Sequence, residues 1–185
     1  MDDDGLSVGD VYRDIIEPAQ QEIGHRWQRN EISVAQEHLA TAISQLVVAN
    51  IYTRVPRSSA NHKFVLVACV PGELHELGAR IASDFLEMAG FSVHFLGADV
   101  PADSLAAMAL ARRPDLVVLS VVTPRAAAGL RDAVAQLRAA AGGTLPILVG
   151  GLAAEDVPDL PDGGVTYVGG DARALTARAR VLLGV

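Results

Sequence analysis

The sequence lacks most of what a membrane span, a disulfide framework or a nucleic-acid surface would need. Its 185 residues include one cysteine, Cys69, so an intrachain disulfide and a thiolate metal site are both excluded. It has no uninterrupted apolar run of about 18 residues and no basic-then-apolar leader, so we expect a cytoplasmic protein without a membrane span. Fifteen scattered basic residues against 22 acidic ones, a formal charge of −7, argue against direct binding of DNA or RNA.

Half of the residues are hydrophobic, which is enough for one core and a small accessory element. We expect a helical cap over residues 1–54, a linker over 55–62 and an α/β domain over 63–185. Apolar residues recur at helical spacing from about residue 7 to 29, with Pro18 kinking or restarting that helix. Ser33 and Gln36 form a capping box that begins a second helix, running from Val34 to about Tyr52. Two helices cannot bury such broad apolar faces alone, so further helices, a partner subunit or a large flat ligand must cover them.

Beyond residue 63, strand-like runs alternate with helical ones. Strands are expected at Phe64–Val70, Ser92–Leu96, Leu116–Val122, Ile147–Val149 and Val165–Val168, and helices near Glu76–Ala89, Asp103–Arg112, Arg125–Ala141 and Asp171–Leu183. Short connections of this kind predict a parallel sheet with helices on both faces. We therefore expect a five-stranded, flavodoxin-like (Rossmann-like) domain with strand order 2-1-3-4-5. Its switch point lies between the first and third strands, where His75 and Ser120 would meet.

Three short motifs fall along the carboxyl edge of this predicted sheet. They are Glu73-x-His75-x-x-Gly78, then Ser120-Val121-Val122 after 41 residues, then Gly150-Gly151 after a further 27. Alone, His75 is typical of a loop histidine that makes a hydrogen bond. An imidazole is also a good ligand for cobalt, and an acidic neighbour can orient it and raise its basicity.

Taken together, these motifs and their spacing resemble the signature of cobalamin-binding domains, with Glu73 and Val122 standing where Asp and Leu are more usual. The resemblance implies that His75 is the lower axial ligand of the cobalt and displaces the dimethylbenzimidazole of the cofactor. The displaced nucleotide tail would run beside the sheet, where glycines leave room for it and Ser120 bonds the base. The implied cofactor contacts are Glu73, Leu74, Glu76, Leu77, Gly78, Ser120, Val122, Gly150, Gly151, Tyr167, Gly169 and Gly170. The alternative is a flavodoxin-like or receiver-like domain whose glycines are only turns, although a receiver would have an acidic cluster after its first strand.

The predicted cap carries a second pattern, in which Trp27 is followed by nine residues and then Glu37-His38. This resembles the cap of cobalamin-dependent photoreceptors of the CarH type. It implies that Trp27, Val34, Glu37 and His38 surround the 5′-deoxyadenosyl group of adenosylcobalamin, bound base-off and His-on; an indole can stack on an adenine or a corrin edge. Gln28 stands where that type has a histidine that captures the cobalt after illumination, which leaves His25 and His38 as substitutes.

The combined resemblance implies a light sensor that turns over no substrate. Photolysis of the cobalt–carbon bond would change the position of the cap and the assembly of the protein, a homo-oligomer with a further downstream partner. Such photoreceptors carry a winged-helix DNA-binding domain and a fuller cap, so a transcriptional role would be indirect here. A stand-alone form resembles the photocobilins, which implies biliverdin as a second chromophore, bound non-covalently because Cys69 falls within a strand.

Two alternative functions remain. The first is a corrinoid carrier subunit of a methyltransferase system, and the second is a radical mutase subunit, which would need a substrate barrel from another chain.

Overall fold

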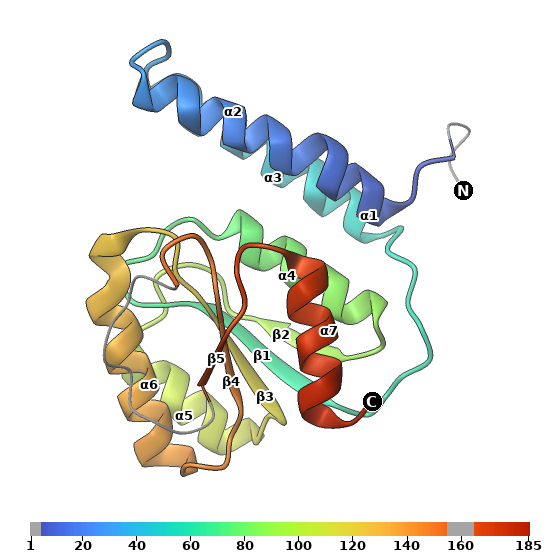
Figure 1. Cartoon of the computed structure of the whole chain (residues 1–185), viewed down its shortest axis with the longest axis vertical. Coiled ribbons are helices and arrows are strands. Elements are labelled where there is room, and N and C mark those ends of the chain that lie inside the picture. Colours follow the sequence, from blue (N-terminus) through green and yellow to red (C-terminus); the bar gives the residue numbers. More distant parts are fainter. Residues whose placement is uncertain (1–4, 155–164) are drawn as a thin grey trace. The chain divides into compact units, whose positions relative to one another are not determined.

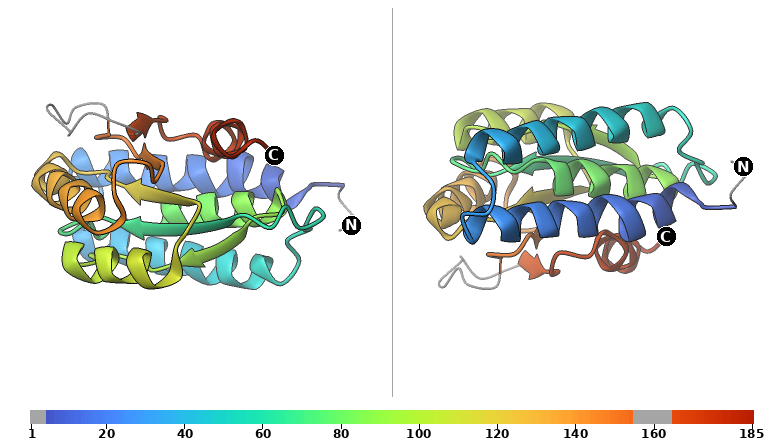
Figure 2. Two further views of the ribbon diagram at one scale, coloured as in Figure 1. Left: turned by 90° about the horizontal axis from the view of Figure 1, so that it is seen from below. Right: turned by 90° about the horizontal axis from the view of Figure 1, so that it is seen from above.

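The computed structural model describes residues 5–154 and 165–185, and the chain divides into two units, Met1–Pro56 and Arg57–Val185. The first unit is helical: α1 (Val8–Val11), the π-helical turn η1 (Tyr12–Ile16), α2 (Glu17–Gln28) and α3 (Val34–Tyr52). The helices α2 and α3 lie side by side as an antiparallel hairpin (Figures 1 and 2).

Both ends of the connection between α2 and α3 follow from local sequence. Asn30 takes the left-handed conformation, with φ 57°, which stops the preceding helix. The predicted capping box is confirmed, because the Gln36 N–H donates to Ser33 Oγ (3.3 Å) and the Ser33 N–H donates to Gln36 Oε1 (2.9 Å).

Pro18 alters the winding of the first helix without breaking it. The turn before it is a π-helix, in which the Glu17 N–H donates to the carbonyl of Tyr12. Pro18 is then the second residue of α2. Because the helix runs into it without a break, the wider turn before it accommodates the proline ring and its missing N–H. The expected kink is therefore a widened turn.

The second unit is the predicted parallel sheet. Its strands are β1 (Phe64–Cys69), β2 (Ser92–Phe95), β3 (Leu116–Ser120), β4 (Ile147–Gly150) and β5 (Val165–Tyr167), in the order β2-β1-β3-β4-β5. All four pairings are parallel, which confirms the predicted topology. The helices are α4 (Leu77–Met88), α5 (Ala102–Arg112), the 3₁₀ turn η2 (Pro124–Ala126), α6 (Ala127–Ala141) and α7 (Ala172–Leu183).

The helices of this unit form two layers around the sheet. α5 packs against α6, and α4 packs against α7 on the other face (Figure 1). The side chains of Leu66, Leu119 and Ile147 are fully buried in the layer under α5 and α6. Because both faces are covered, the strands are almost continuously apolar, as the sequence predicted.

The predicted bounds differ from the observed ones by one or two residues, and at β3 the reason is visible. The strand ends at Ser120 and not at Val122, because the backbone N–H groups of Val122 and Thr123 turn away to donate to the side chain of Glu73. Among the described helices, none is both long and apolar enough to cross a membrane.

Candidate functional site

The sheet brings the three sequence motifs to one edge. In the strand register, Cys69 at the end of β1 lies beside Ser120, and Ser120 lies beside Gly150. The loop that carries His75 leaves β1 at this same carboxyl edge. Open parallel α/β sheets bind their ligands at this edge, next to the point where the strand order reverses.

The Glu73 carboxylate is the centre of the site, although its side chain is fully buried. Its Oε1 accepts from the His75 backbone N–H (2.9 Å) and bonds His75 Nδ1 (2.6 Å). Its Oε2 accepts from the backbone N–H groups of Val122 and Thr123 (2.8 Å each) and from Thr123 Oγ1 (3.0 Å). A buried charge is tolerated when it is hydrogen-bonded in this way. Glu73 therefore ties the His75 loop to the segment that follows β3.

These bonds determine the protonation of both side chains. Burial works to raise the pKa of the Glu73 carboxyl, but hydrogen bonds from the ring and backbone of His75 and from the backbone of Val122 and Thr123 outweigh it and lower that pKa from 4.5 to about 2. An ionised carboxylate can only accept hydrogen bonds, so the hydrogen of a neutral His75 ring lies on Nδ1. The lone pair of Nε2 then faces away from Glu73. The His75 side chain is 55% exposed, and Nε2 is the atom through which this ring could bind a metal.

Two residues that the sequence analysis missed hold the His75 loop. Asp99, after β2, accepts from the Gly72 N–H through Oδ1 (2.7 Å) and donates its own N–H to the Glu73 carbonyl (2.9 Å). Gly129 in α6 lies so close to Pro71 that a Cβ there would come within 2.0 Å of the Pro71 carbonyl oxygen. Neither contact has a local sequence signal, because each joins segments far apart in the chain.

The predicted glycines fall into two groups according to the space around them. Gly78 and Gly169 are exposed, and within the described part of the chain no heavy atom beyond their local backbone lies within 4 Å of the place where a Cβ would stand. Both therefore leave a surface that a ligand can approach. Gly151 differs: its φ is 107°, and a Cβ there would lie 2.2 Å from the Val121 carbonyl oxygen. Gly151 was predicted to leave space for the nucleotide tail, but its backbone conformation and the nearby Val121 carbonyl already require a glycine there.

The remaining predicted residues of this unit are positioned as follows. Leu74 is next to His75 in the sequence and is 65% exposed. Glu76 is the N-cap residue of α4, and Leu77 is the first residue of that helix.

The other predicted residues lie around the ends of β4 and β5. A Cβ at Gly150 would be in ordinary contact with the Val168 carbonyl, and one at Gly170 would lie 3.9 Å from Leu152. Tyr167 ends β5. Leu152, which the sequence analysis did not select, is 79% exposed.

The predicted cap residues gather at one end of the helical hairpin. Trp27 is in the last turn of α2, and Val34, Glu37 and His38 are in the first turns of α3. Trp27 is 47% exposed and Val34 is 53% exposed. His38 Nδ1 lies 2.5 Å from Glu37 Oε2, so the cap carries a second carboxylate–histidine pair.

A metal bound by His75 must bring most of its ligands with it. Over residues 5–154 and 165–185, no group of three or more His, Cys, Asp and Glu side chains is placed to hold a metal ion. A macrocyclic cofactor meets this requirement, because the ring supplies four ligands and the protein needs to supply only one more.

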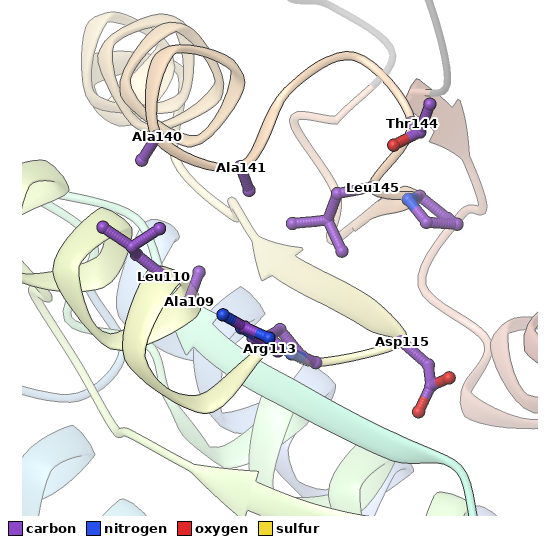
Figure 3. A pocket seen from close by; sticks show the side chains of 10 residues that line it. Ala109, Leu110, Arg113, Asp115, Ala140, Ala141, Thr144 and Leu145 are labelled. Carbon is purple, nitrogen blue, oxygen red and sulfur yellow. The ribbon is translucent and has the colours of Figure 1, made fainter.

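A cavity of about 430 Å³ lies elsewhere in this unit, between the loops that enter β3 and β4, and is lined by residues such as Leu110, Arg113 and Leu145 (Figure 3). It is at the amino edge and contains none of the predicted site residues.

Comparison with known proteins also points to a macrocyclic cofactor, vitamin B12. Residues 64–179 match a protein-family model described as a B12 binding domain, and residues 2–52 match a second model of that description. The chain is 38% identical over 145 residues to the HTH-type transcriptional repressor CarH of Myxococcus xanthus, covering 78% of this chain and 48% of that protein. It is 29% identical over 119 residues to dimethylamine corrinoid protein 3 of Methanosarcina mazei, covering 63% of this chain and 71% of that protein.

Among solved structures, the monomethylamine corrinoid protein of Methanosarcina barkeri superposes with a TM-score of 0.80 at 15% identity, covering 95% of this chain and 84% of that one. At this identity the likeness concerns the fold alone. The chain spans about half the length of the repressor that it matches.

Proposed function

The chain belongs to the family of B12 binding domains and binds cobalamin, and from this membership we propose that it is an adenosylcobalamin-dependent light sensor. The Glu73–His75 pair at the carboxyl edge of the sheet supports cobalamin binding, because the imidazole is held by Nδ1 and its Nε2 faces away from the carboxylate. The observation that carries the choice of light sensing is the placement of Trp27 and the Glu37–His38 pair at one end of the helical hairpin. In this proposal the protein acts as a regulator and turns over no substrate.

In this proposal His75 Nε2 would be the atom by which the protein binds the cobalt. Glu73 keeps the other ring nitrogen protonated and fixes the plane of the ring, and its negative charge makes the imidazole a stronger electron donor. Asp99 and Gly129 hold the loop in place. The open positions at Gly78 and Gly169 leave room for the corrin and the nucleotide tail, and the exposed side chains of Leu74 and Leu152 offer apolar contacts.

Light sensing depends on the cap residues. When bound, adenosylcobalamin would supply a cobalt–carbon bond that light can break. Trp27, Val34, Glu37 and His38 would contact the adenosyl group in the dark, so its loss removes what holds the cap and changes the preferred assembly. The similarity to CarH, and the spacing of Trp27 and Glu37-His38, support this choice of upper ligand.

Assembly would use an apolar face of α3, which we name the α3 stripe: Leu39, Ile43, Leu46 and Val47. These side chains are 38–65% exposed, and helical periodicity places them on the side of α3 away from Thr41 and Ser44. Between Leu39 and Tyr52 the sequence contains no charged residue, so two copies of the stripe can pair without bringing like charges together. We therefore propose a second copy of this chain as its partner.

Biliverdin is proposed as a second, non-covalent chromophore. A thioether link would need a nucleophilic thiolate, but burial, together with the nearby carboxylates of Glu73 and Glu76, raises the pKa of Cys69 to about 12. A purified chain that shows no near-red absorbance after loading with biliverdin would rule this second chromophore out.

A corrinoid carrier subunit of a methyltransferase system is the second candidate function. Its support is the similarity to dimethylamine corrinoid protein 3, over most of that protein's length. A carrier needs the same Glu73–His75 pair but an upper face that accepts a methyl group in place of a bulky adenosyl group.

The experiment that separates the two is reconstitution with adenosylcobalamin in the dark, followed by green light, with absorption spectra and elution volume recorded before and after. A light sensor shows a change in both, and His75→Ala abolishes them. The control His62→Asn, at an exposed residue of the linker whose φ is 59°, does not. Tighter binding of methylcobalamin, with no light-driven change in elution, would contradict light sensing and support the carrier.

A further inference from the structure

A series of polar contacts crosses the interface between α2 and α3 and ends at His38. We name this set of residues the α2–α3 seam: Gln20, Ser44, Thr41, Glu37 and His38. The Gln20 amide lies between Ser44 Oγ (2.7 Å) and Thr41 Oγ1 (3.0 Å). Thr41 Oγ1 is also 2.9 Å from Glu37 Oε1, and Glu37 Oε2 is 2.5 Å from His38 Nδ1. Ser44, at the inner end, is buried, and the His38 side chain, at the outer end, is 75% exposed. The contacts therefore run from the inside of the helical hairpin to its surface.

The Glu37–His38 contact requires a support of this kind. Side chains of adjacent helical residues do not face one another; the near neighbours on a helix are three and four residues apart. The Glu37 carboxylate can reach the ring of His38 only if it is held in one orientation. Thr41, one turn further along α3, is the residue that bonds its other oxygen.

The number of available hydrogens decides which atom donates in each of these contacts. The Thr41 hydroxyl has a single hydrogen and touches both Glu37 Oε1 and the Gln20 amide. As placed in the structure, Gln20 Nε2 donates to Ser44 Oγ and Gln20 Oε1 faces Thr41 Oγ1. The one Thr41 hydrogen cannot serve both acceptors, and giving it to the charged Glu37 carboxylate requires the opposite orientation of the amide, in which Nε2 donates to Thr41 Oγ1. The amide oxygen then accepts from the Ser44 hydroxyl. Both orientations of an amide fill the same volume, and this one gives each hydroxyl hydrogen an acceptor of its own.

We propose that Gln20 and Thr41 are positioning residues for His38. Through Glu37 they keep the hydrogen of the His38 ring on Nδ1 and present Nε2 outward as an acceptor or a metal ligand. The proposal deepens the proposed function, in which His38 serves the upper side of the cofactor. The first test uses the cofactor-free protein. The positioning role can therefore fail while cobalamin binding is confirmed, and cobalamin binding can fail while the positioning role is confirmed.

The test measures the tautomer of His38 by long-range proton–nitrogen correlation spectra of the ¹⁵N-labelled full chain at pH 8. We expect mainly the Nδ1–H form in the wild type. Thr41→Val keeps the shape but removes the hydroxyl, and it should lower the ratio of Nδ1–H to Nε2–H about fivefold, the factor for one net hydrogen bond. Thr41→Ser should restore it.

Gln20→Glu separates positioning from packing. A carboxylate at residue 20 fills the same volume but can only accept, so it would take the Thr41 hydrogen away from Glu37 and shift the tautomer as Thr41→Val does. Gln21→Ala, on the same helix at an exposed neighbouring position, is the control and should leave the tautomer unchanged. An unchanged His38 spectrum in both Thr41→Val and Gln20→Glu, with helical circular dichroism retained, would overturn the proposal.

A second readout connects the seam to the cofactor. Dissociation of adenosylcobalamin should be about fivefold faster in Thr41→Val than in Thr41→Ser, while hydroxocobalamin, which lacks the adenosyl group, leaves both at the same rate. Equal rates for adenosylcobalamin in the two variants would show that the seam does not act on the upper ligand.

Discussion

Glu73 connects three parts of the chain: its own loop, the imidazole of His75 and the segment that follows β3. Five hydrogen bonds reach its two oxygens from His75, Val122 and Thr123. The longer side chain, in place of the more usual aspartate, still reaches the ring. One carboxylate thus orients the metal ligand and stabilises the fold around it.

The pH dependence of stability should report this role. The pKa of Glu73 is lowered from 4.5 to about 2 in the folded chain, so its contribution is complete above pH 4.5 and is lost as the pH falls toward 2. The contribution amounts to about 3 kcal/mol. We expect the free energy of unfolding of the wild type, measured in urea, to exceed that of Glu73→Gln near neutral pH and the two to converge between pH 4.5 and 2. A difference that stays constant over this range would contradict the assignment.

At the scale of elements, the glycines at the carboxyl edge separate what the fold needs from what a ligand needs. Gly151→Ala places a Cβ 2.2 Å from the Val121 carbonyl at a φ of 107°, and we expect it to lower the free energy of unfolding by at least about 2 kcal/mol. In Gly169→Ala the added Cβ meets no atom of the described residues within 4 Å, apart from its chain neighbours, and the change in stability should be less than about 0.5 kcal/mol.

The same pair should behave differently toward cobalamin. In Gly169→Ala the added methyl group lies on the open surface where the nucleotide tail is proposed to run, so we expect roughly tenfold weaker binding in an absorption titration. Unchanged affinity in this stable variant would move the tail away from Gly169.

The strands and helices of the α/β unit could be predicted because each depends on a local pattern. Runs such as Phe64–Cys69 are apolar on both faces, and short connections between alternating strands and helices predict a parallel sheet. The order 2-1-3-4-5 is the usual one for a flavodoxin-like sheet, and the structure has it. The end of β3 could not be predicted, because Val122 leaves the strand to bond a glutamate 49 residues earlier in the chain.

The candidate site was predictable to the same extent. His75, Glu73 and Ser120 are marked by their spacing, and the register of β1, β3 and β4 brings their segments together. Asp99 and Gly129 support the His75 loop through contacts with distant segments, and Gln20 contacts Thr41 across two helices. No periodicity or spacing marks such residues, since their partners are determined by the tertiary fold.

At the scale of the whole molecule, the α3 stripe should determine assembly. Leu46→Glu places two like charges together in a symmetric pair, and we expect it to raise the dissociation constant of the dimer at least about tenfold. Gln45→Glu adds the same charge to the same helix outside the stripe and is the control. Light scattering coupled to size-exclusion chromatography at several concentrations gives the masses. A wild type with the mass of a single chain at every concentration would contradict the proposed pairing.

The central claim is that His75 ligates the cobalt of a bound cobalamin in place of the cofactor's own base. It is tested most directly by electron paramagnetic resonance of reduced cob(II)alamin bound to ¹⁵N-labelled protein, because ¹⁴N and ¹⁵N split the cobalt lines differently. We predict doublets from the ¹⁵N of the protein in the wild type, triplets in the unlabelled protein, and loss of the doublets in His75→Ala. Triplets that persist in the ¹⁵N-labelled wild type would show that the ligand is the cofactor's own ¹⁴N base, and would contradict the account.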